Sequence, residues 1–171
     1  MAAAPDDDGH HIVIDGRRWR ATDPAIPAPF RQELVNALMA ARRDVGAARR
    51  ADDAAAEQAS RSRVQDAKVA LGERGEPWWD DATSTGRRVR VTATVLTLLW
   101  SRRPESSICP SDAARVVGGA GWRSLVPLAR DVADELARDG LVVVTQGDQT
   151  VEANGAKGPV RIRRGSRFDS R

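Results

Sequence analysis

Cys109 is the only cysteine of the chain, and a thiolate at this position could act as a nucleophile. It lies in the stretch ICPSDAARVVG (residues 108–118), where its only supports are the start of a predicted helix and Arg115. Both histidines, His10 and His11, lie near the other end of the sequence. We therefore interpret Cys109 as a small buried hydrophobe, and we expect no catalytic residue and no enzymatic activity.

The sequence offers few ligands for a metal or a cofactor. One cysteine and two histidines can neither form an internal disulfide nor supply the soft ligands of a structural zinc site. We expect no metal, no cofactor and a fold that is held together by burial of apolar side chains alone.

Arginine is the residue type that gives this sequence most of its binding chemistry. Of the 27 basic residues, only Lys68 and Lys157 are lysines. Residues 1–80 hold 12 basic and 14 acidic side chains, whereas residues 81–171 hold 15 and 10. The second half is therefore the candidate for contact with a polyanion such as nucleic acid.

The pattern of apolar residues indicates two small units that would position these side chains. Residues 1–9 predict a disordered start. Residues 10–22 predict a β-hairpin that turns at Asp15-Gly16, a pair favoured in two-residue type I′ turns. With the helices that follow, this ribbon makes up the first unit, residues 10–76.

Two helical segments follow the ribbon. Phe30, Leu34 and later apolar residues recur every three or four positions, and a second such stretch runs over residues 54–71. A single rod over residues 30–74 is an alternative, but it would need a second chain to bury its apolar stripe. We predict a helical hairpin with its turn near residues 51–53.

Residues 77–86 predict a linker, although Trp78 and Trp79 are too apolar to be left in water without a reason. We interpret the two tryptophans as folding back over the open face of the helical hairpin. The alternative is that they form a docking surface for a partner.

Residues 87–164 predict the second unit. The run RRVRVTATVLTLLWSRR fits both strand and helix spacing, and its length favours a helix. A short β-prone run then precedes a helix capped by Ser111, a glycine turn at residues 118–121 and a longer helix capped by Ser124. LVVVTQ, GDQ and TVEA then predict a strand, a turn and a second extended run, and GPVRIRR adds another. Residues 165–171 predict a frayed tail.

This order of elements is that of a winged helix. The predicted fold class is mainly α with small β: an N-terminal β-ribbon plus helical hairpin, followed by a winged helix-turn-helix domain.

The sequence also resembles a known family. ICPSDAARVVG and the stretch from WRSL to GPVRIRR are similar to a small bacterial winged-helix family of unassigned function, with I-C-P-S-x-x-A-R, W-R and G-P-x-R-I as fixed elements. The resemblance covers residues 87–164. It implies the winged-helix fold and no biochemical role. The first unit is similar to short actinobacterial proteins of unknown role, some labelled biopolymer-transport-like, a label that nothing in this sequence supports.

The first functional hypothesis is that the second unit binds double-stranded DNA as a transcription-regulatory accessory protein. Winged helices insert their third helix into the major groove, while the wing and the helix ends contact phosphates. Aspartates also lie on the predicted third helix, so we expect binding that is led by phosphate contacts. The candidate nucleic-acid-binding residues are Arg88, Arg90, Arg123, Ser124, Arg130, Lys157, Arg161, Arg163 and Arg164.

The second hypothesis is a protein-interaction or dimerisation module that binds no nucleic acid, with the helical hairpin as the contact surface for a protein partner or a homodimer. No apolar run approaches the roughly 20 residues that cross a bilayer. The first residues lack the basic start and apolar core of a secretory signal. We expect a cytoplasmic protein without membrane contact.

Overall fold

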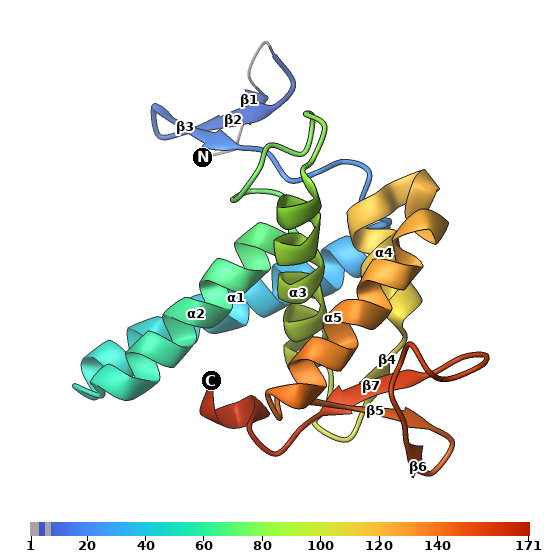
Figure 1. The fold of residues 1–171 in the computed structure, drawn as a ribbon. Helices are drawn as coiled ribbons and strands as arrows, with labels where there is room; N and C mark the ends of the chain where they lie inside the picture. The colour runs from blue at the N-terminus through green and yellow to red at the C-terminus, as the bar shows by residue number, and fades with distance from the viewer. Residues whose placement is uncertain (1–3, 6–7) are drawn as a thin grey trace.

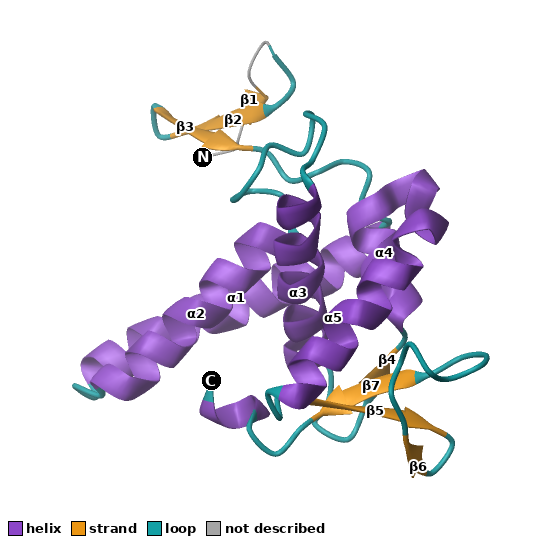
Figure 2. Cartoon of the chain, viewed as in Figure 1, coloured by secondary structure: helices purple, strands orange, loops and turns teal. Residues whose placement is uncertain are grey.

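The computed structural model describes residues 4–5 and 8–171, and it is mainly helical with two small β-sheets (Figure 1, Figure 2). A three-stranded ribbon lies at one end of the molecule, and a four-stranded sheet lies at the opposite end. Two long helices project to one side. The predicted class, mainly α with small β, is confirmed.

The N-terminal ribbon consists of β1 (Ala4–Pro5), β2 (His11–Ile14) and β3 (Arg17–Arg20) in that order. Asp15 and Gly16 join β2 to β3 with φ values of 49° and 73°, as a type I′ turn requires. The predicted hairpin is thus confirmed. Strand β1 adds to the free edge of β2, where the sequence predicted a disordered start; residues 1–3 and 6–7 of that start lie outside the described residues.

Helices α1 (Ala28–Arg50) and α2 (Ala54–Ala70) form the predicted helical hairpin, and the alternative of one continuous rod is wrong. The chain turns at residues 51–53, where the Asp53 carboxylate accepts a hydrogen bond of 2.9 Å from the Ala56 amide and caps α2. Leu34 and Leu38 are buried inside the chain. The leucine stripe is therefore covered without a second chain.

The second half of the chain begins with α3 (Ser84–Ser101). The segment whose spacing fits both a strand and a helix is therefore a helix, as its length predicted. It continues through β4 (Ser107–Ile108), α4 (Pro110–Gly118), the 3₁₀ helix η1 (Gly119–Leu125) and α5 (Val126–Arg138). Strands β5 (Val142–Gln146), β6 (Gln149–Thr150) and β7 (Arg161–Arg164) follow, and the 3₁₀ helix η2 (Phe168–Ser170) ends the chain. The antiparallel sheet has the order β4-β7-β5-β6.

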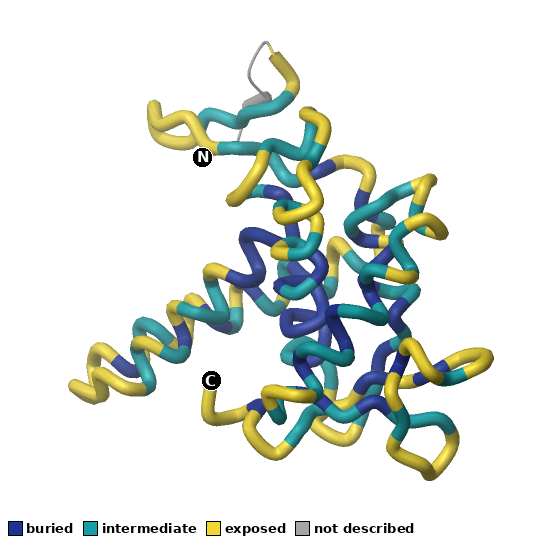
Figure 3. Tube along the Cα trace, viewed as in Figure 1, coloured by how far each residue is buried: buried dark blue, intermediate teal, exposed yellow. Residues whose placement is uncertain are grey.

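Helix α3 lies at the centre of the molecule, with the helical hairpin on one side and α4 and α5 on the other (Figure 1). Val95 and Leu98 of α3 are fully buried, and one continuous apolar cluster joins them to Leu34 of the hairpin and Ile162 of β7. Figure 3 shows this burial concentrated along α3, whereas the tip of the hairpin is exposed. Both predicted units therefore contribute to one core.

The predicted cap of α4 at Ser111 is wrong. Cys109 occupies the N-cap, Pro110 is the first helical residue, and the Asp112 carboxylate accepts a hydrogen bond of 3.0 Å from the Cys109 amide. A proline fits this first position because its fixed φ is already helical and its missing N–H has no partner there. Ser111 lies inside the first turn of the helix.

The predictions of a helix cap at Ser124 and of a glycine turn at residues 118–121 are also wrong. The turn is replaced by η1, in which the Ser124 hydroxyl donates a hydrogen bond of 2.9 Å to the Gly121 carbonyl. Helix α5 begins only at Val126. Pro127 is its second residue, so the missing N–H costs no helical hydrogen bond.

The predicted frayed tail at residues 165–171 is wrong. Phe168 is 1% exposed, and its ring lies 4.9 Å from that of Trp100 on α3. The Arg171 guanidinium forms an ion pair with Asp66 on α2. A single aromatic residue in a polar run gives no periodic signal, but burial of its ring is enough to hold the segment on the core.

Candidate nucleic-acid interface

The outward face of α5 is covered by the loop between β6 and β7. Arg130 donates hydrogen bonds to the carbonyl oxygens of Ala153, Ala156 (3.1 Å) and Gly158 (2.6 Å). The Asp134 carboxylate accepts from the backbone amide of Ala153 at 2.6 Å and from that of the next residue at 3.0 Å. These side chains hold the loop against the helix, so they face the chain itself and not an open surface.

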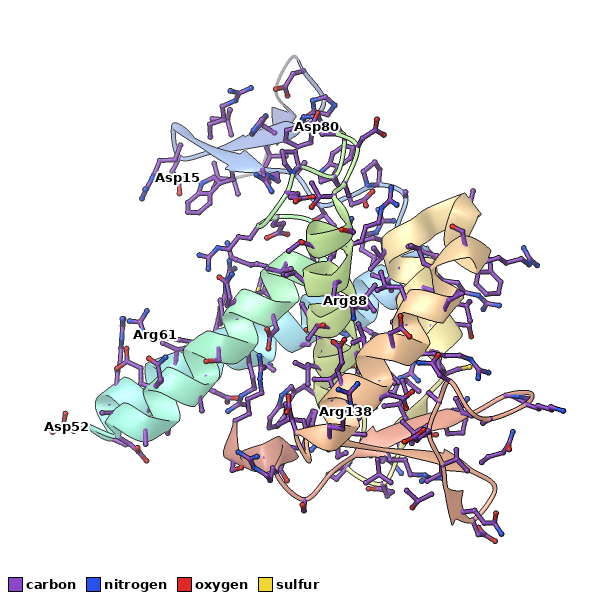
Figure 4. All side chains as sticks on the ribbon, in the orientation of Figure 1. Asp15, Asp52, Arg61, Asp80, Arg88 and Arg138 are labelled. Atoms are coloured by element: carbon purple, nitrogen blue, oxygen red, sulfur yellow. The ribbon has the colours of Figure 1, made fainter. Side chains whose placement is uncertain are left out.

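The remaining acidic side chains of this face bind the start of α3. Arg88 lies between α3 and α5 (Figure 4) and donates to the Glu135 carboxylate at 2.6 Å, with Asp131 at 4.0 Å. The Asn154 amide of the covering loop donates to Asp131 at 2.7 Å. The predicted site residues Arg88 and Arg130 are therefore engaged within the molecule.

Two further predicted site residues are structural. Arg90 is 14% exposed and forms an ion pair of 2.8 Å with Asp23, whose side chain is 7% exposed. Arg164 donates to the carbonyl of Leu99 at 2.8 Å and lies over the ring of Trp100 at 4.9 Å. Both guanidinium groups connect segments that are far apart in sequence.

Arg161 and Arg163 are exposed on the outer face of β7, because side chains alternate along a strand and Ile162 takes the inner face. Arg161 donates to the Ser107 hydroxyl at 2.9 Å, and Arg163 donates to the Glu105 carbonyl at 2.9 Å. These acceptors are neutral, so the positive charges are not compensated by them. Lys157 is exposed at the loop between β6 and β7.

A second exposed group lies where α4 meets η1. The guanidinium groups of Arg115 and Arg123 lie over the ring of Trp122, at 4.6 and 4.7 Å from its centroid. Both arginines and Ser124 are exposed. Arg115 is not among the residues that were predicted from the sequence to bind nucleic acid. Because α4 ends at Gly118 and Trp122 belongs to η1, helical spacing gave no signal for this contact.

A groove with a volume of about 740 Å³ runs beside this arginine pair, between the linker and the end of α4. We call it the linker groove; Trp78, Trp79, Val89 and Leu125 are among its lining residues. The tryptophans were predicted to fold over the open face of the helical hairpin, but their ring partners lie on the predicted ribbon (residues 10–22). Trp79 stacks on His10 at 4.3 Å, and the Trp78 indole donates to the Ala21 carbonyl at 3.0 Å.

Cys109 is partly exposed, so its prediction as a buried hydrophobe is wrong, although Ile108 beside it is fully buried. Its position as N-cap places it at the surface end of α4. Across residues 4–5 and 8–171, no three side chains of the metal-binding types are grouped so as to hold an ion. None of the helices in that part of the chain combines the length and the apolar character needed to cross a membrane.

A search of curated proteins found no match to this chain. A comparison with models of protein families gave a match over residues 88–165. This range nearly coincides with the residues that resemble a family of unassigned function. Residues 88–165 are thus similar to the domain family described as "Protein of unknown function (DUF3253)", which supports placing this half of the chain in a family without an assigned role.

Proposed function

We propose that α3 to β7 form a winged helix that binds double-stranded DNA mainly through its phosphates, as part of an accessory protein in transcription regulation. The sheet order supports this proposal. Strand β4 pairs with β7, and β7 pairs with β5, around the three helices α3, α4 and α5. In a winged helix, the strand after the first helix joins the wing hairpin in this way.

The exposed cations carry the functional part of the proposal. Arg161 and Arg163 extend from the outer face of the small sheet, and Arg115 and Arg123 extend from the end of α4 and η1. One guanidinium group can donate two parallel hydrogen bonds to the oxygens of a phosphate. None of these four arginines forms an ion pair with a carboxylate in the described part of the chain.

We do not propose that the middle of α5 contacts the edges of DNA bases. Arg130 and Asp134 already bind the loop that covers this face, and Arg88 binds Glu135. A helix whose polar side chains are engaged in this way has few groups left for base edges. The proposed complex is therefore weakly selective for sequence and strongly dependent on salt.

A protein-interaction module is the second candidate, and the linker groove favours it. Trp79 and Leu125 line this groove, and Val89 beside them is 52% exposed. Exposed apolar side chains around a groove are typical of contact surfaces. The helical hairpin is less suited to dimerisation than the sequence suggested, because Leu34 and Leu38 are buried within the chain.

Titration of a labelled random duplex at about 50 mM salt tests the first proposal, because phosphate contacts are strong at this ionic strength. We expect binding that the double variant Arg161→Ala/Arg163→Ala weakens by about tenfold or more. The matched control is Arg31→Ala/Arg43→Ala, which removes the same charge from α1. Absence of binding by the wild-type protein would exclude DNA and leave the interaction module as the better proposal.

A further inference from the structure

A second groove, with a volume of about 650 Å³, lies between α1 and α2. We call it the hairpin groove. It is lined from α1 by Arg42, Val45 and Arg49, whose spacing of three and four residues puts them on one side of the helix. From α2 it is lined by Arg61 and Gln65, again four residues apart. Helical spacing thus gathers the polar side chains of both helices along one groove.

The groove has an excess of positive charge. Arg171 also lines it, but this guanidinium is paired with Asp66. Arg49 and Arg61 share one carboxylate, that of Glu57, at 2.9 and 2.8 Å. Two guanidinium groups on one carboxylate leave one positive charge uncompensated at this end of the groove.

The other end of the groove is more strongly positive. Arg74 donates to the neutral amide oxygen of Gln65. Arg42 is exposed and forms no ion pair with any residue of the described segments. Burial lowers the pKa of Lys68 behind them, and the charges of Arg42 and Arg74 add to this decrease. The carboxylate of Glu73 raises the pKa of Lys68 and so opposes these effects, but the guanidinium groups of Arg42 and Arg74 themselves line the groove.

We propose that the hairpin groove binds an oligophosphate anion, a molecule with two or more linked phosphate groups. The inference goes beyond the proposed DNA binding, since it concerns a different surface and different residues. Arg42 and Arg74 would bind one phosphate group, and Arg49 and Arg61 would bind another through the N–H groups that Glu57 does not use. Linked phosphates suit this pairing because each is bound by two guanidinium groups.

The size of the groove favours a small anion over a nucleic-acid duplex. Sites for small molecules have volumes of roughly 300 to 1,000 Å³. The hairpin groove falls in this range, with Val45 and Val64 among its lining residues and the hydroxyl of Ser62 and the amide of Gln58 as further polar groups. A duplex would instead require a wide and continuous positive surface.

Calorimetric titration of the full chain with inorganic tripolyphosphate at about 50 mM salt tests the proposal. We expect saturable binding that Arg42→Ala/Arg74→Ala weakens by about tenfold or more. The control Arg31→Ala/Arg43→Ala removes the same net charge, and Arg43 is the direct neighbour of Arg42 on an adjacent side of α1. This control is expected to lose much less affinity than the groove variant, because neither Arg31 nor Arg43 lines the groove.

ATP, orthophosphate and duplex DNA are the comparison ligands. Tighter binding of tripolyphosphate or ATP than of orthophosphate supports the proposal, and the ratio of the first two separates a free oligophosphate from a nucleotide. Equal loss in the groove variant and the control would overturn it, because general charge would then explain the binding. So would absence of tripolyphosphate binding, or a groove variant that loses DNA binding only. Unchanged thermal unfolding of both variants shows that the fold is retained.

Discussion

The arginines of the segment from α3 to β7 and those of the helical hairpin are used in different ways. Arg88, Arg90 and Arg164 of the first region each bind a carboxylate or a carbonyl within the molecule. In the hairpin, Arg42 has no such partner among the described residues, and Arg49 and Arg61 share a single carboxylate. Yet the hairpin belongs to the half of the chain with more acidic than basic residues.

The difference shows that the net charge of a segment does not give its accessible charge. Asp131, Asp134 and Glu135 of α5 bind the covering loop and Arg88, so their carboxylates are engaged within the molecule although they stay at its surface. A tally over the sequence counts all of them. Pairing across the fold decides which charges remain for a ligand. Variants that remove either an arginine bound within the molecule or an exposed arginine can test this difference.

The largest effect is expected for Arg90→Ala, which breaks the ion pair with Asp23. Removing one partner of a buried pair leaves an uncompensated charge and costs about 3 kcal/mol or more. Arg87→Ala, three residues earlier on the exposed side of α3, should change stability by no more than about 0.5 kcal/mol. Urea unfolding of both variants measures this contrast. Equal small losses would show that Arg90 is not a structural residue.

Arg164 and Arg163 provide a second matched pair, on opposite faces of β7. Arg164→Ala removes hydrogen bonds to the Leu99 and Arg102 carbonyls and a stacked cation over Trp100, at a cost of about 2 kcal/mol. Arg163→Ala should leave stability almost unchanged and weaken DNA binding instead. If both variants lost stability alike, β7 would not separate structural from functional arginines.

Arg130→Ala is expected to release the loop that covers α5. Three backbone carbonyls lose a charged donor, and we expect a stability loss of about 1 to 2 kcal/mol. Hydrogen exchange at the amides of Ala153 and Asn154 should become faster, because the loop lies less tightly on Asp134. Unchanged exchange at these amides would show that Asp134 alone holds the loop.

The smallest effect concerns the junction of the two regions. Glu76 accepts hydrogen bonds from the side chain and the amide of Thr83 at the start of α3, and these bonds lower its pKa below the ordinary value of 4.5. A lowered folded pKa means that this stabilisation is complete above the ordinary pKa and is lost as the pH falls through the folded value.

Glu76→Gln should therefore be slightly less stable than wild type at neutral pH, and its stability should fall less steeply in acid. Urea unfolding at a series of pH values measures both slopes, with Glu152→Gln as an exposed control. Parallel curves for wild type and Glu76→Gln would contradict the role of Glu76 as the acceptor at this helix start.

Local sequence patterns predicted the elements well where periodicity is strong. The Asp15-Gly16 turn and the stripe through Leu34 specified the ribbon and the hairpin. Helix starts were less predictable, because Ser111 and Ser124 are good caps by type while prolines and a 3₁₀ turn determined the actual boundaries. The buried Phe168 stands alone in a polar run, so no pattern indicated it.

The candidate site was predictable only in part, for a physical reason. Arg161, Arg163 and Arg123 were predicted as binding residues and are exposed in the structure. The partners of Arg90, Arg164 and Arg171 lie 67, 65 and 105 residues away in sequence. Ion pairs over such separations form only when the whole core is assembled, so no local pattern could separate bound arginines from free ones.

The salt dependence of duplex binding tests the central proposal most directly. The logarithm of the binding constant falls linearly with the logarithm of the salt concentration. The magnitude of this slope decreases by about 0.9 for each phosphate contact that is lost. We predict that Arg161→Ala/Arg163→Ala reduces the magnitude of the slope by about 1.8, while Arg31→Ala/Arg43→Ala leaves it unchanged. A double variant with the wild-type slope would contradict phosphate binding by the outer face of β7.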